Sequence, residues 1–354
     1  MRQKKILNFL NILKMLLNKN KVIIACAGSG KTTSIVRDAL KIKDQRVLVT
    51  TYTNENLDQI KAIFIEEAGC IPSNITVQSW FSFLLQEGIR PYQNYITDKK
   101  RVQSILFQAK HSRYHRKDNY LTKSNFIYSN KVSEFVYECD RKTEGLVTNR
   151  LEKIYDYIFI DELQDFAGYD LNLLEIYFNS RINVIIVGDP RQATYSTNNA
   201  QKNRQHRRSN IYSWVKGKED ELTTQEINDC YRCNQRICDF ANKLFPDLPQ
   251  AVSKNKSITG HDGIFCIHNC EVRSYIDTYN PTILKYNKRA DTLGFYALNI
   301  GLAKGRTFNR VLIFPTQPML NYLKTDDLSK VGDKHKLYVA VTRAKYSATF
   351  VKGE

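Results

Sequence analysis

The sequence predicts an α/β protein made of two halves, in each of which helices cover both faces of a mostly parallel sheet. Short apolar runs with the character of buried strands alternate with helical segments, and this alternation is typical of parallel sheets. A Gly-rich turn joins the first strand to a helix, and a second set of strands and helices lies near the C-terminus. A length of 354 residues is sufficient for two domains with separate cores.

The expected elements follow from the length and spacing of the apolar runs. The first strand covers residues 22–25, and a helix runs from about Thr32 to Leu40 after the Gly-rich turn. Apolar residues at helical spacing predict an amphipathic helix over Ile6 to Leu17 that lies on the first domain. The remaining expected elements are strands at 46–50, 157–160, 183–187 and 310–314, and a helix at 336–345.

A polar, basic, Tyr-rich stretch interrupts the first half, and its composition indicates an inserted helical subdomain rather than a linker. A basic run at 201–208 is expected to form a loop. The predicted divisions are a first domain of residues 1–88 and 151–215, an inserted subdomain of 89–150, and a second domain of 216–354 with a short insertion near 246–290.

Composition narrows the class of partner. Lysine and arginine number 53 against 36 acidic residues, which gives a net charge of +17. Such an excess favours a polyanion, of which nucleic acid is the commonest, although a generally basic surface is the alternative. An apolar fraction of 42% excludes a disordered chain, and the apolar run near the N-terminus is too short to span a bilayer, so no membrane partner is expected.

The eight cysteines are scattered through a chain that is too large to need disulfides, which fits a reducing compartment. Cys230 and Cys233 have the C-x-x-C spacing of half a zinc site, which Cys266, His268 and Cys270 would complete. The alternative is that these thiols pack as small apolar groups.

The Gly-rich turn has the composition of a phosphate-binding loop. Residues 27–33 follow a strand and open a helix, so backbone N–H groups and the helix N-terminus face the phosphates. Lys31 is expected to reach the β- and γ-phosphates, and the Thr32 hydroxyl is expected to bind Mg²⁺. The pattern G-x-x-x-x-G-K-[ST] is incomplete because residue 25 is alanine. The expected nucleotide-binding residues of the loop are Ala27, Gly28, Ser29, Gly30, Lys31, Thr32 and Thr33.

A pair of carboxylates supplies the second half of a hydrolytic site. Asp161 and Glu162 end a buried strand, which places Asp161 next to the Mg²⁺ ion and Glu162 beside an attacking water. The two motifs together predict an ATPase or a GTPase.

Seven further segments resemble the motifs of the UvrD/Rep/PcrA helicases of superfamily 1, in the order of that family. The D-E-x-Q-D segment at 161–165 and the V-T-R-A segment that begins at residue 341 are the most specific. The motifs, numbered as in the family, are Ia at 48–54, Ib at 76–81, II at 161–165, III at 187–192, IV at 230–233, V at 301–305 and VI at 341–345.

The resemblance implies two RecA-like domains with ATP between them. It assigns Gln192 to sensing the γ-phosphate, Tyr231 to stacking on adenine, and Arg232 and Arg343 to stabilising charge on the phosphoryl group. Gly305 belongs to the implied nucleotide-binding set. The predicted catalytic residues are Glu162, Gln192, Arg232 and Arg343.

The resemblance also implies a strand-binding surface. Tyr52 and Trp80 occupy the positions of base-stacking aromatic residues, with burial in the core as the alternative for Trp80. The hydroxyls of Thr51, Thr53 and Ser79 are expected to contact phosphates.

Several departures from the family qualify the resemblance, among them the run Tyr195-Ser196-Thr197-Asn198, which lacks the family's stacking aromatic residue, and Thr307 in place of the glutamate of motif V. Residues 1–20 contain no match to the motif that recognises adenine, so ATP or GTP stays open. The stretch 234–300 is too short for the family's large second insertion, which regulates unwinding. The first domain therefore keeps a helical insertion, and the second has a much reduced one.

The sequence predicts an ATP-dependent helicase or translocase on single-stranded DNA that uses ATP and Mg²⁺, with 3′→5′ movement implied by the family. The alternatives are a nucleotide-switched subunit of a repair or defence complex without autonomous unwinding, and an RNA-binding ATPase. The sequence leaves open whether the chain also binds duplex junctions or RNA, and whether a protein partner supplies regulation or nuclease activity. The expected location is the cytoplasm of a bacterium, or the nucleus or viral factory for a eukaryotic virus.

Overall fold

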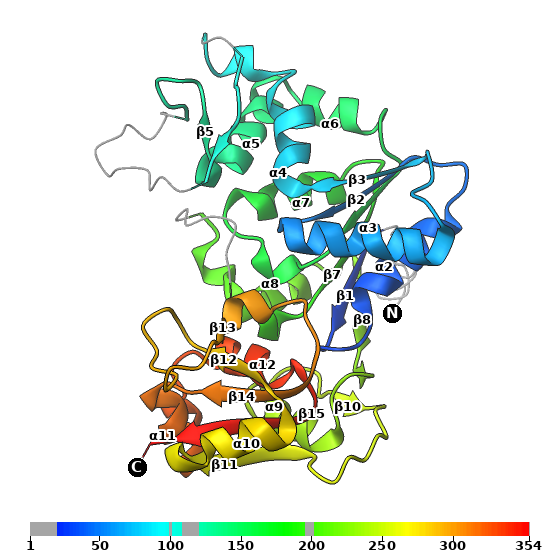
Figure 1. Cartoon of the computed structure of the whole chain (residues 1–354). Coiled ribbons are helices and arrows are strands. Elements are labelled where there is room, and N and C mark those ends of the chain that lie inside the picture. Colours follow the sequence, from blue (N-terminus) through cyan, green and yellow to red (C-terminus); the bar gives the residue numbers. More distant parts are fainter. Residues whose placement is uncertain (1–19, 99–100, 108–119, 195–201, 354) are drawn as a thin grey trace, which may run out of the picture. The chain divides into compact units, whose positions relative to one another are not determined.

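The computed structural model describes residues 20–98, 101–107, 120–194 and 202–353 (Figure 1). The helix expected over residues 6–17 lies outside these ranges. The chain divides into two compact units, the first comprising Met1–Ile24, Thr32–Pro190 and Tyr195–Gln225, and the second Ala25–Lys31, Arg191–Thr194 and Glu226–Glu354. Within the described residues, no helix has both the length and the apolar character that crossing a membrane requires.

A six-stranded sheet forms the first unit, in the order β3-β2-β6-β7-β1-β8. Five of these strands pair in parallel, with Val47 beside Ile75 and Tyr157, and Ile23 beside Val187. The strands are β1 (Lys21–Ala25), β2 (Val47–Thr51), β3 (Ile75–Ser79), β6 (Tyr157–Ile160), β7 (Asn183–Gly188) and β8 (Thr223–Ile227).

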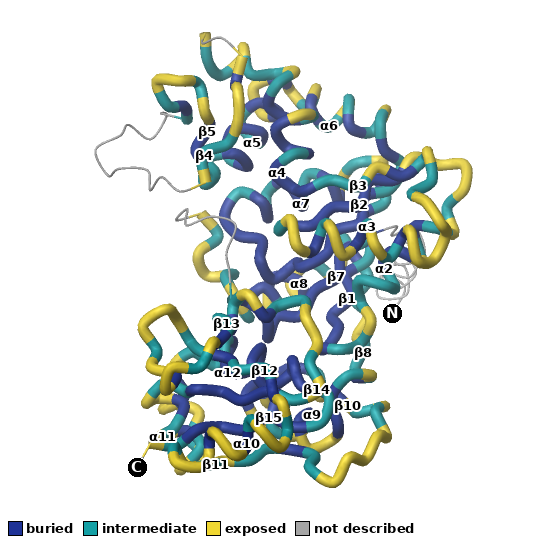
Figure 2. The backbone as a smooth tube through the Cα atoms, in the orientation of Figure 1, coloured by how far each residue is buried: buried dark blue, intermediate teal, exposed yellow. Residues whose placement is uncertain are grey.

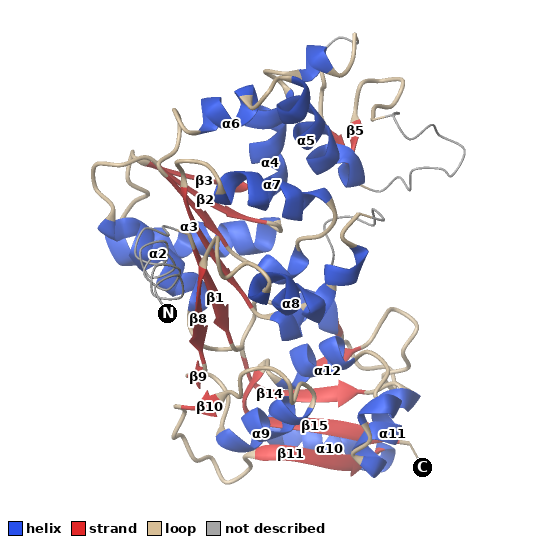
Figure 3. Cartoon of the chain, turned by 180° about the vertical axis from the view of Figure 1, so that it is seen from behind, coloured by secondary structure: helices blue, strands red, loops and turns tan. Residues whose placement is uncertain are grey.

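Helices cover both faces of this sheet. α2 (Lys31–Lys41) and α3 (Asn54–Ala68) lie on one face, and α7 (Tyr169–Phe178) and α8 (Ile211–Lys216) on the other (Figures 1 and 3). α3 shows how local sequence sets the bounds. The Thr53 side chain accepts a hydrogen bond from the Asn56 N–H, and Gly69 ends the helix at φ +74°.

The region predicted as an inserted helical subdomain contains both helices and short strands. Just before this region, at the end of the predicted first domain, a helical turn α4 (Trp80–Phe83) continues into a π-helical segment, Leu84–Ile89, which contacts α5 (Val132–Lys142) of the region. Gly88 permits this contact, because a Cβ atom there would lie 2.7 Å from Val136 Cγ2. The remaining elements are α6 (Leu146–Leu151), β4 (Ile105–Leu106) and β5 (Ile127–Tyr128).

The second unit contains a five-stranded parallel sheet in the order β11-β15-β14-β12-β13. α10 (Val272–Tyr279) covers one face, and α9 (Gln235–Lys243) and α12 (Lys334–Val341) cover the other (Figures 1 and 3). The other elements are β9 (Asp229–Cys230), β10 (Val252–Ser253), β11 (Gly263–His268), β12 (Thr282–Lys285), β13 (Leu298–Asn299), β14 (Phe308–Phe314), β15 (Ala344–Lys352) and α11 (Gln317–Thr325).

The α/β fold with two parallel sheets is confirmed, and each expected strand is present with bounds shifted by at most two residues at either end. The helix expected at 336–345 was placed wrongly at its C-terminal end. It ends at Val341, and Ala344–Lys352 forms β15 instead. The run of Tyr, Thr, Phe and Val in that segment suits a central strand, and β14 and β11 satisfy its backbone on both sides.

Burial follows the sheets. Figure 2 shows the central strands β1, β2, β6 and β7 of the first sheet and most of β14 and β15 of the second as buried, the edge strands β8 and β11 as intermediate to exposed, and the loops of the inserted region as largely exposed. Val22, Val47, Ile158 and Val184 have no exposed surface, which matches a sheet covered on both faces. The edges at which the parallel strands end are therefore where polar side chains can gather.

Candidate nucleotide site and nucleic-acid interface

The phosphate loop connects β1 to α2 and depends on two glycines in the left-handed conformation. Gly28 and Gly30 have φ values of +77° and +78°, which side chains with a Cβ rarely adopt. A Cβ atom on Gly28 would also lie 2.6 Å from the Cβ of Arg232. The Tyr231 N–H donates to the Gly28 carbonyl at 2.9 Å. The loop thus packs directly on two residues that were predicted to bind the nucleotide.

The carboxylate pair lies at the end of β6 in the first unit. The Thr32 hydroxyl donates to Asp161 Oδ2 at 2.8 Å, so the two predicted Mg²⁺ ligands are adjacent. Glu162 is buried and has φ +66°, an unusual value for a residue other than glycine. The Glu162 N–H donates to Asp161 Oδ1 at 2.9 Å, which holds the two acids in a fixed relation.

Gln164 was part of the D-E-x-Q-D pattern but received no role from the sequence. Its amide N–H donates to the Glu162 carboxylate, and its Oε1 accepts the Asp189 N–H at 2.9 Å. Gly188 permits this packing, because a Cβ atom there would lie 2.8 Å from Gln164 Oε1. Gln164 therefore joins the strand end that carries the acids to the strand end that leads to Gln192.

Gln192 and Arg343, the predicted γ-phosphate sensor and second arginine finger, meet in the second unit. Arg343 Nη2 donates to Gln192 Oε1 at 3.0 Å, and both side chains are buried. The guanidinium also donates to the carbonyls of Val339 and Arg306. A buried guanidinium with several acceptors has a defined orientation.

Three residues that the sequence did not single out support this group. The Tyr338 hydroxyl accepts the Ala27 N–H of the phosphate loop at 3.3 Å. The Arg191 guanidinium carbon lies 5.5 Å from the centroid of the Tyr338 ring, and a ring nitrogen of His335 lies 3.1 Å from the Arg191 carbonyl oxygen. Tyr338 and His335 lie on α12, and nothing in their local sequence marks them, because only the fold brings that helix to the loop.

The remaining predicted nucleotide-binding residues are placed as follows. Tyr231 is 63% exposed, so its ring is free to stack on a planar ligand. Arg232 Nη1 donates to the Thr342 carbonyl at 3.1 Å, which ties motif IV to motif VI. Gly305 has φ +82° at the turn before β14.

The cysteines of the C-x-x-C pair are buried, and the Cys233 N–H donates to Cys230 Sγ at 3.4 Å. Hydrogen bonding to Cys230, together with burial, raises the pKa of the Cys233 thiol well above its ordinary value, and the same hydrogen bonding lowers the pKa of Cys230. A cysteine that binds zinc has to be a thiolate, and Cys266 and Cys270 are exposed. Among the described residues, no group of three or more His, Cys, Asp or Glu side chains is arranged to hold a metal. These features favour packed thiols.

The hydroxyls predicted to contact a strand have structural roles as well. The Thr53 hydroxyl caps α3, and the Ser79 hydroxyl accepts the Ser82 N–H at 3.2 Å. Thr51 is completely buried. Tyr52 is partly buried, with its ring centroid 5.2 Å from that of Phe81. Burial, with the charges of Asp170 and Asp165, raises the pKa of Tyr52 to about 12.

Trp80 is a correction to the sequence-based expectation. Its side chain has no exposed surface, and its ring packs against Phe83, Phe166 and Tyr177. The indole Nε1–H donates to Asp170 Oδ1 at 2.8 Å. A buried indole whose faces contact other rings has no surface for a base, so Trp80 is a core residue in this structure.

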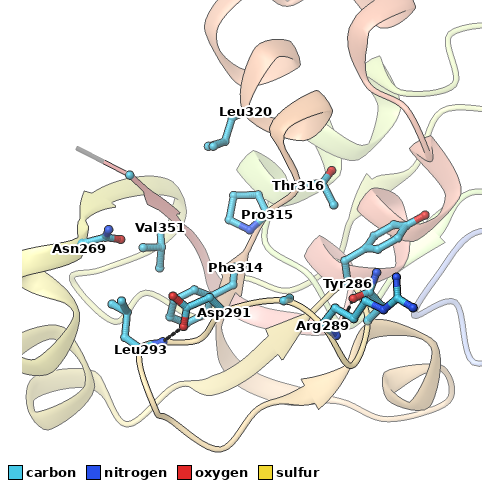
Figure 4. A pocket seen from close by; sticks show the side chains of 13 residues that line it. Asn269, Tyr286, Arg289, Asp291, Leu293, Phe314, Pro315, Thr316, Leu320 and Val351 are labelled. Carbon is cyan, nitrogen blue, oxygen red and sulfur yellow. Dashed lines mark hydrogen bonds between the residues drawn. The ribbon is translucent and has the colours of Figure 1, made fainter.

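A pocket of about 460 Å³ lies at the edge of the second sheet where the parallel strands end (Figure 4). Its lining combines apolar side chains such as Phe314 and Leu320 with polar ones such as Arg289 and Asn269. Ligands of open α/β sheets commonly bind at this edge. None of the residues predicted from the sequence to form a site lines this pocket.

A glycine-rich loop between β1 and α2, followed by a threonine whose hydroxyl donates to the aspartate of a buried Asp–Glu pair, defines a P-loop nucleotide-binding protein. Family models that match the chain define it more narrowly than this class. The model of the viral superfamily 1 RNA helicase core domain matches residues 121–352, and an AAA domain model matches residues 10–198. The chain belongs to the superfamily 1 helicases.

Three curated proteins are similar to parts of the chain. A putative ATP-dependent DNA helicase of Acanthamoeba polyphaga mimivirus is 28% identical over 246 residues, which are 68% of this chain and 30% of that protein. The Gabija protein GajB of Bacillus cereus is 26% identical and the match covers 67% of this chain and 49% of that one. A probable DNA helicase II homolog of Mycoplasma capricolum is 23% identical, with 69% and 40% covered. The matches thus span less than half the length of these relatives.

Among solved structures, the helicase nonstructural protein 10 of an arterivirus superposes with a TM-score of 0.51 at 17% identity. The superposition covers 96% of this chain and 62% of the viral chain. At this identity the likeness concerns the fold, and it agrees with two RecA-like domains.

Proposed function

We propose that the chain hydrolyses ATP with Mg²⁺ and uses the hydrolysis to move along single-stranded DNA. The observation that carries the proposal is the arrangement around Asp161 and Glu162. The Thr32 hydroxyl lies 2.8 Å from Asp161 Oδ2, and Glu162 is held in a left-handed conformation directly after it. Unusual backbone conformations of buried residues are concentrated at active sites, where the surrounding structure maintains them.

The residues fit the cofactor. The Thr32 hydroxyl and the Asp161 carboxylate are oxygen donors of the kind Mg²⁺ prefers, and they adjoin a loop whose glycines expose backbone N–H groups to phosphates. The ion would supply charge neutralisation at the β- and γ-phosphates. Glu162, positioned by Gln164, is then the base that orients and deprotonates the attacking water.

Tyr231 and Arg232 are proposed to supply a platform for the base and positive charge. The exposed Tyr231 ring suits stacking on adenine, and Arg232 is anchored beside it through the Thr342 carbonyl. The hydrogen bond between Arg343 and Gln192 couples the predicted arginine finger to the predicted γ-phosphate sensor. In this scheme a change at the γ-phosphate alters the position of both side chains, which supplies the conformational step that a motor needs.

DNA is the proposed polymer because two of the similar proteins are named DNA helicases. The matched core domain is described as that of RNA helicases, so RNA is the second arm of the test. The net charge of +17 suits either polymer.

The test is steady-state ATP hydrolysis with no polymer, with single-stranded DNA and with single-stranded RNA of equal length, at one stated salt concentration. Strong stimulation by DNA alone is expected. Equal hydrolysis in all three conditions would contradict the proposal that the chain is a motor and favour the nucleotide-switched subunit. Stimulation by RNA alone would mean that the polymer is RNA instead of DNA. Displacement of streptavidin from a biotinylated 3′ or 5′ end then tests the proposed 3′→5′ direction.

A further inference from the structure

Asp170 is a completely buried carboxylate in the first turn of α7. It accepts a hydrogen bond from Trp80 Nε1 at 2.8 Å and another from the Ser133 hydroxyl, both at Oδ1. Its second oxygen, Oδ2, accepts the Ala167 N–H at 3.4 Å. Two segments that are distant in the sequence, at Trp80 and Ser133, therefore meet at one carboxylate, which also accepts a hydrogen bond from the turn just before its own helix.

Each of these segments belongs to a different part of the first unit. Trp80 follows directly on Ser79 at the end of β3, where strand-binding residues were predicted. Ala167 lies two residues after the D-E-x-Q-D segment that carries the predicted catalytic acid. Ser133 lies on α5 of the inserted region.

The physical chemistry makes this junction sensitive to small movements. A buried carboxylate is stable only while donors compensate for its lost hydration, and losing one donor exposes the full cost of the charge. A shift of the Ala167 loop therefore changes how strongly Asp170 holds Trp80, and the reverse holds as well. The packing of Trp80 against Phe166, with ring centroids 4.9 Å apart, connects the same two segments independently of the charge.

We propose that Asp170 is a positioning residue that transmits changes at the nucleotide site, through Ala167, to Ser79 at the end of β3 and to Trp80, which follows it. This inference rests on the proposed function, because it concerns the coupling between ATP and the strand. The buried charge also acts on Tyr52, the predicted stacking residue after β2, whose pKa burial and then Asp170 raise.

Two substitutions break the junction at different bonds. Trp80→Phe removes the indole donor and keeps an aromatic ring in the core. Asp170→Asn keeps one acceptor oxygen but turns an amide N–H₂ towards the Ala167 N–H, so that bond is lost. Trp214→Phe is the matched control. Trp214 is also buried, and its Nε1 donates at 3.4 Å to the carboxylate of Glu175, a residue outside motif Ib (76–81) and motif II (161–165).

The experiment measures the dissociation constant of a fluorescein-labelled single-stranded oligonucleotide with and without a non-hydrolysable ATP analogue, together with the stimulation of ATP hydrolysis by the strand. In the wild type the analogue is expected to change strand affinity. The coupling factor is the ratio of the two dissociation constants, measured without and with the analogue. Both junction variants should reduce this factor by roughly fivefold or more, and Trp214→Phe should retain it. The double variant should lose little more than either single variant, because both break one junction.

A merely structural role predicts a different result. Lower thermal stability with the wild-type coupling factor and wild-type stimulation in both variants would overturn the inference and leave the proposed function intact. A wild-type protein that shows neither coupling nor stimulation would instead overturn the proposed function, and the inference with it. The tryptophan emission of the Trp214→Phe chain, which comes from Trp80 alone, provides a second readout and should change when the analogue binds.

Discussion

At the scale of single residues, backbone conformation decides which side chains the nucleotide site accepts. Gly28, Gly30 and Glu162 all have φ values between +66° and +78°. The two glycines adopt this region without a steric cost, whereas Glu162 is held there by its hydrogen bonds with Asp161 and Gln164 and by the surrounding core. The site is therefore specified by backbone geometry as much as by chemical groups.

Replacing Gly28 with alanine should abolish nucleotide binding as well as reduce stability. A Cβ in the left-handed region costs about 1–2 kcal/mol by itself, and here the added atom would lie 2.6 Å from Arg232 Cβ. Gly69→Ala is the control, because Gly69 has φ +74° and nothing lies within 4 Å of its Cβ position. Both variants should lose stability in urea unfolding, but only Gly28→Ala should lose affinity in a fluorescent-ATP titration. Equal nucleotide affinity in the two variants would show that Arg232 moves aside freely.

Replacing Glu162 with glutamine should separate binding from hydrolysis. The amide keeps the shape of the side chain and an acceptor for Gln164, but it cannot take a proton from water. The dissociation constant for ATP should stay close to that of the wild type, while kcat should fall by roughly 10²-fold or more. Glu67→Gln, which changes an exposed ion pair with Arg37, serves as control. Turnover near the wild-type rate would remove Glu162 from the proposed mechanism.

At the scale of elements, an aromatic stack joins the start of β11 to α10. The His261 ring lies 3.9 Å from the Phe265 ring and 4.1 Å from the Tyr279 ring, measured between centroids, with interplanar angles below 20°. Its Nε2 lies 2.9 Å from the Tyr275 hydroxyl, which lies 2.6 Å from Thr349 Oγ1 of β15. Strand, helix and loop are thus connected through one titratable ring.

This stack should make the second unit less stable in mild acid. Burial, and then Arg310, lower the pKa of His261, although Asp262 partly opposes them. Because the unfolded chain binds the proton more readily, stability should be complete above about pH 6.5 and fall as the pH drops towards the lower folded-state pKa. Urea unfolding between pH 8 and pH 5 tests this, with His261→Phe as the comparison. The variant should lose less stability than the wild type over that interval, and equal losses would assign the acid sensitivity to other groups.

At the scale of the whole molecule, the excess of positive charge is the property that bears on a polymer. Several cations are already paired, including Arg37 with Glu67, Arg46 with Asp156 and Lys243 with Asp326. Exposed pairs of this kind contribute little to stability. They also leave less charge at those positions for phosphates, so net charge alone does not identify a strand-binding surface.

Neutralising the basic run before α8 should lower the salt dependence of strand binding if that run contacts phosphates. Each phosphate contact contributes a slope of about −0.7 to the plot of log affinity against log salt for a single strand. The test variant changes Lys202, Arg204, Arg207 and Arg208 to glutamine. The control changes four paired cations, Arg37, Arg46, Arg141 and Lys243, and so lowers the net charge by the same amount. Equal slopes for the two variants would mean that only total charge matters.

Much of the fold could be predicted from the sequence because buried parallel strands are continuous apolar runs. The strand at 157–160 was placed without error, and the strands at 22–25 and 183–187 differ by one residue at one end. The phosphate loop could also be recognised from the sequence, because phosphate binding requires glycines, a lysine and a threonine at fixed spacing. The helix at 336–345 was misplaced at its end because apolar residues there suit helix and strand equally, and pairing with β14 decided the outcome.

By itself, therefore, the sequence determined the fold class, the phosphate loop and the motifs that place the chain among superfamily 1 helicases, because these depend on residue types at short separations along the chain. Only the tertiary structure decided which side chains meet. It buried Trp80 on Asp170, joined Arg343 to Gln192, and brought Tyr338 to the phosphate loop. Such contacts join residues between 90 and 311 positions apart. Their partners are selected by the packing of whole elements, which no local pattern encodes.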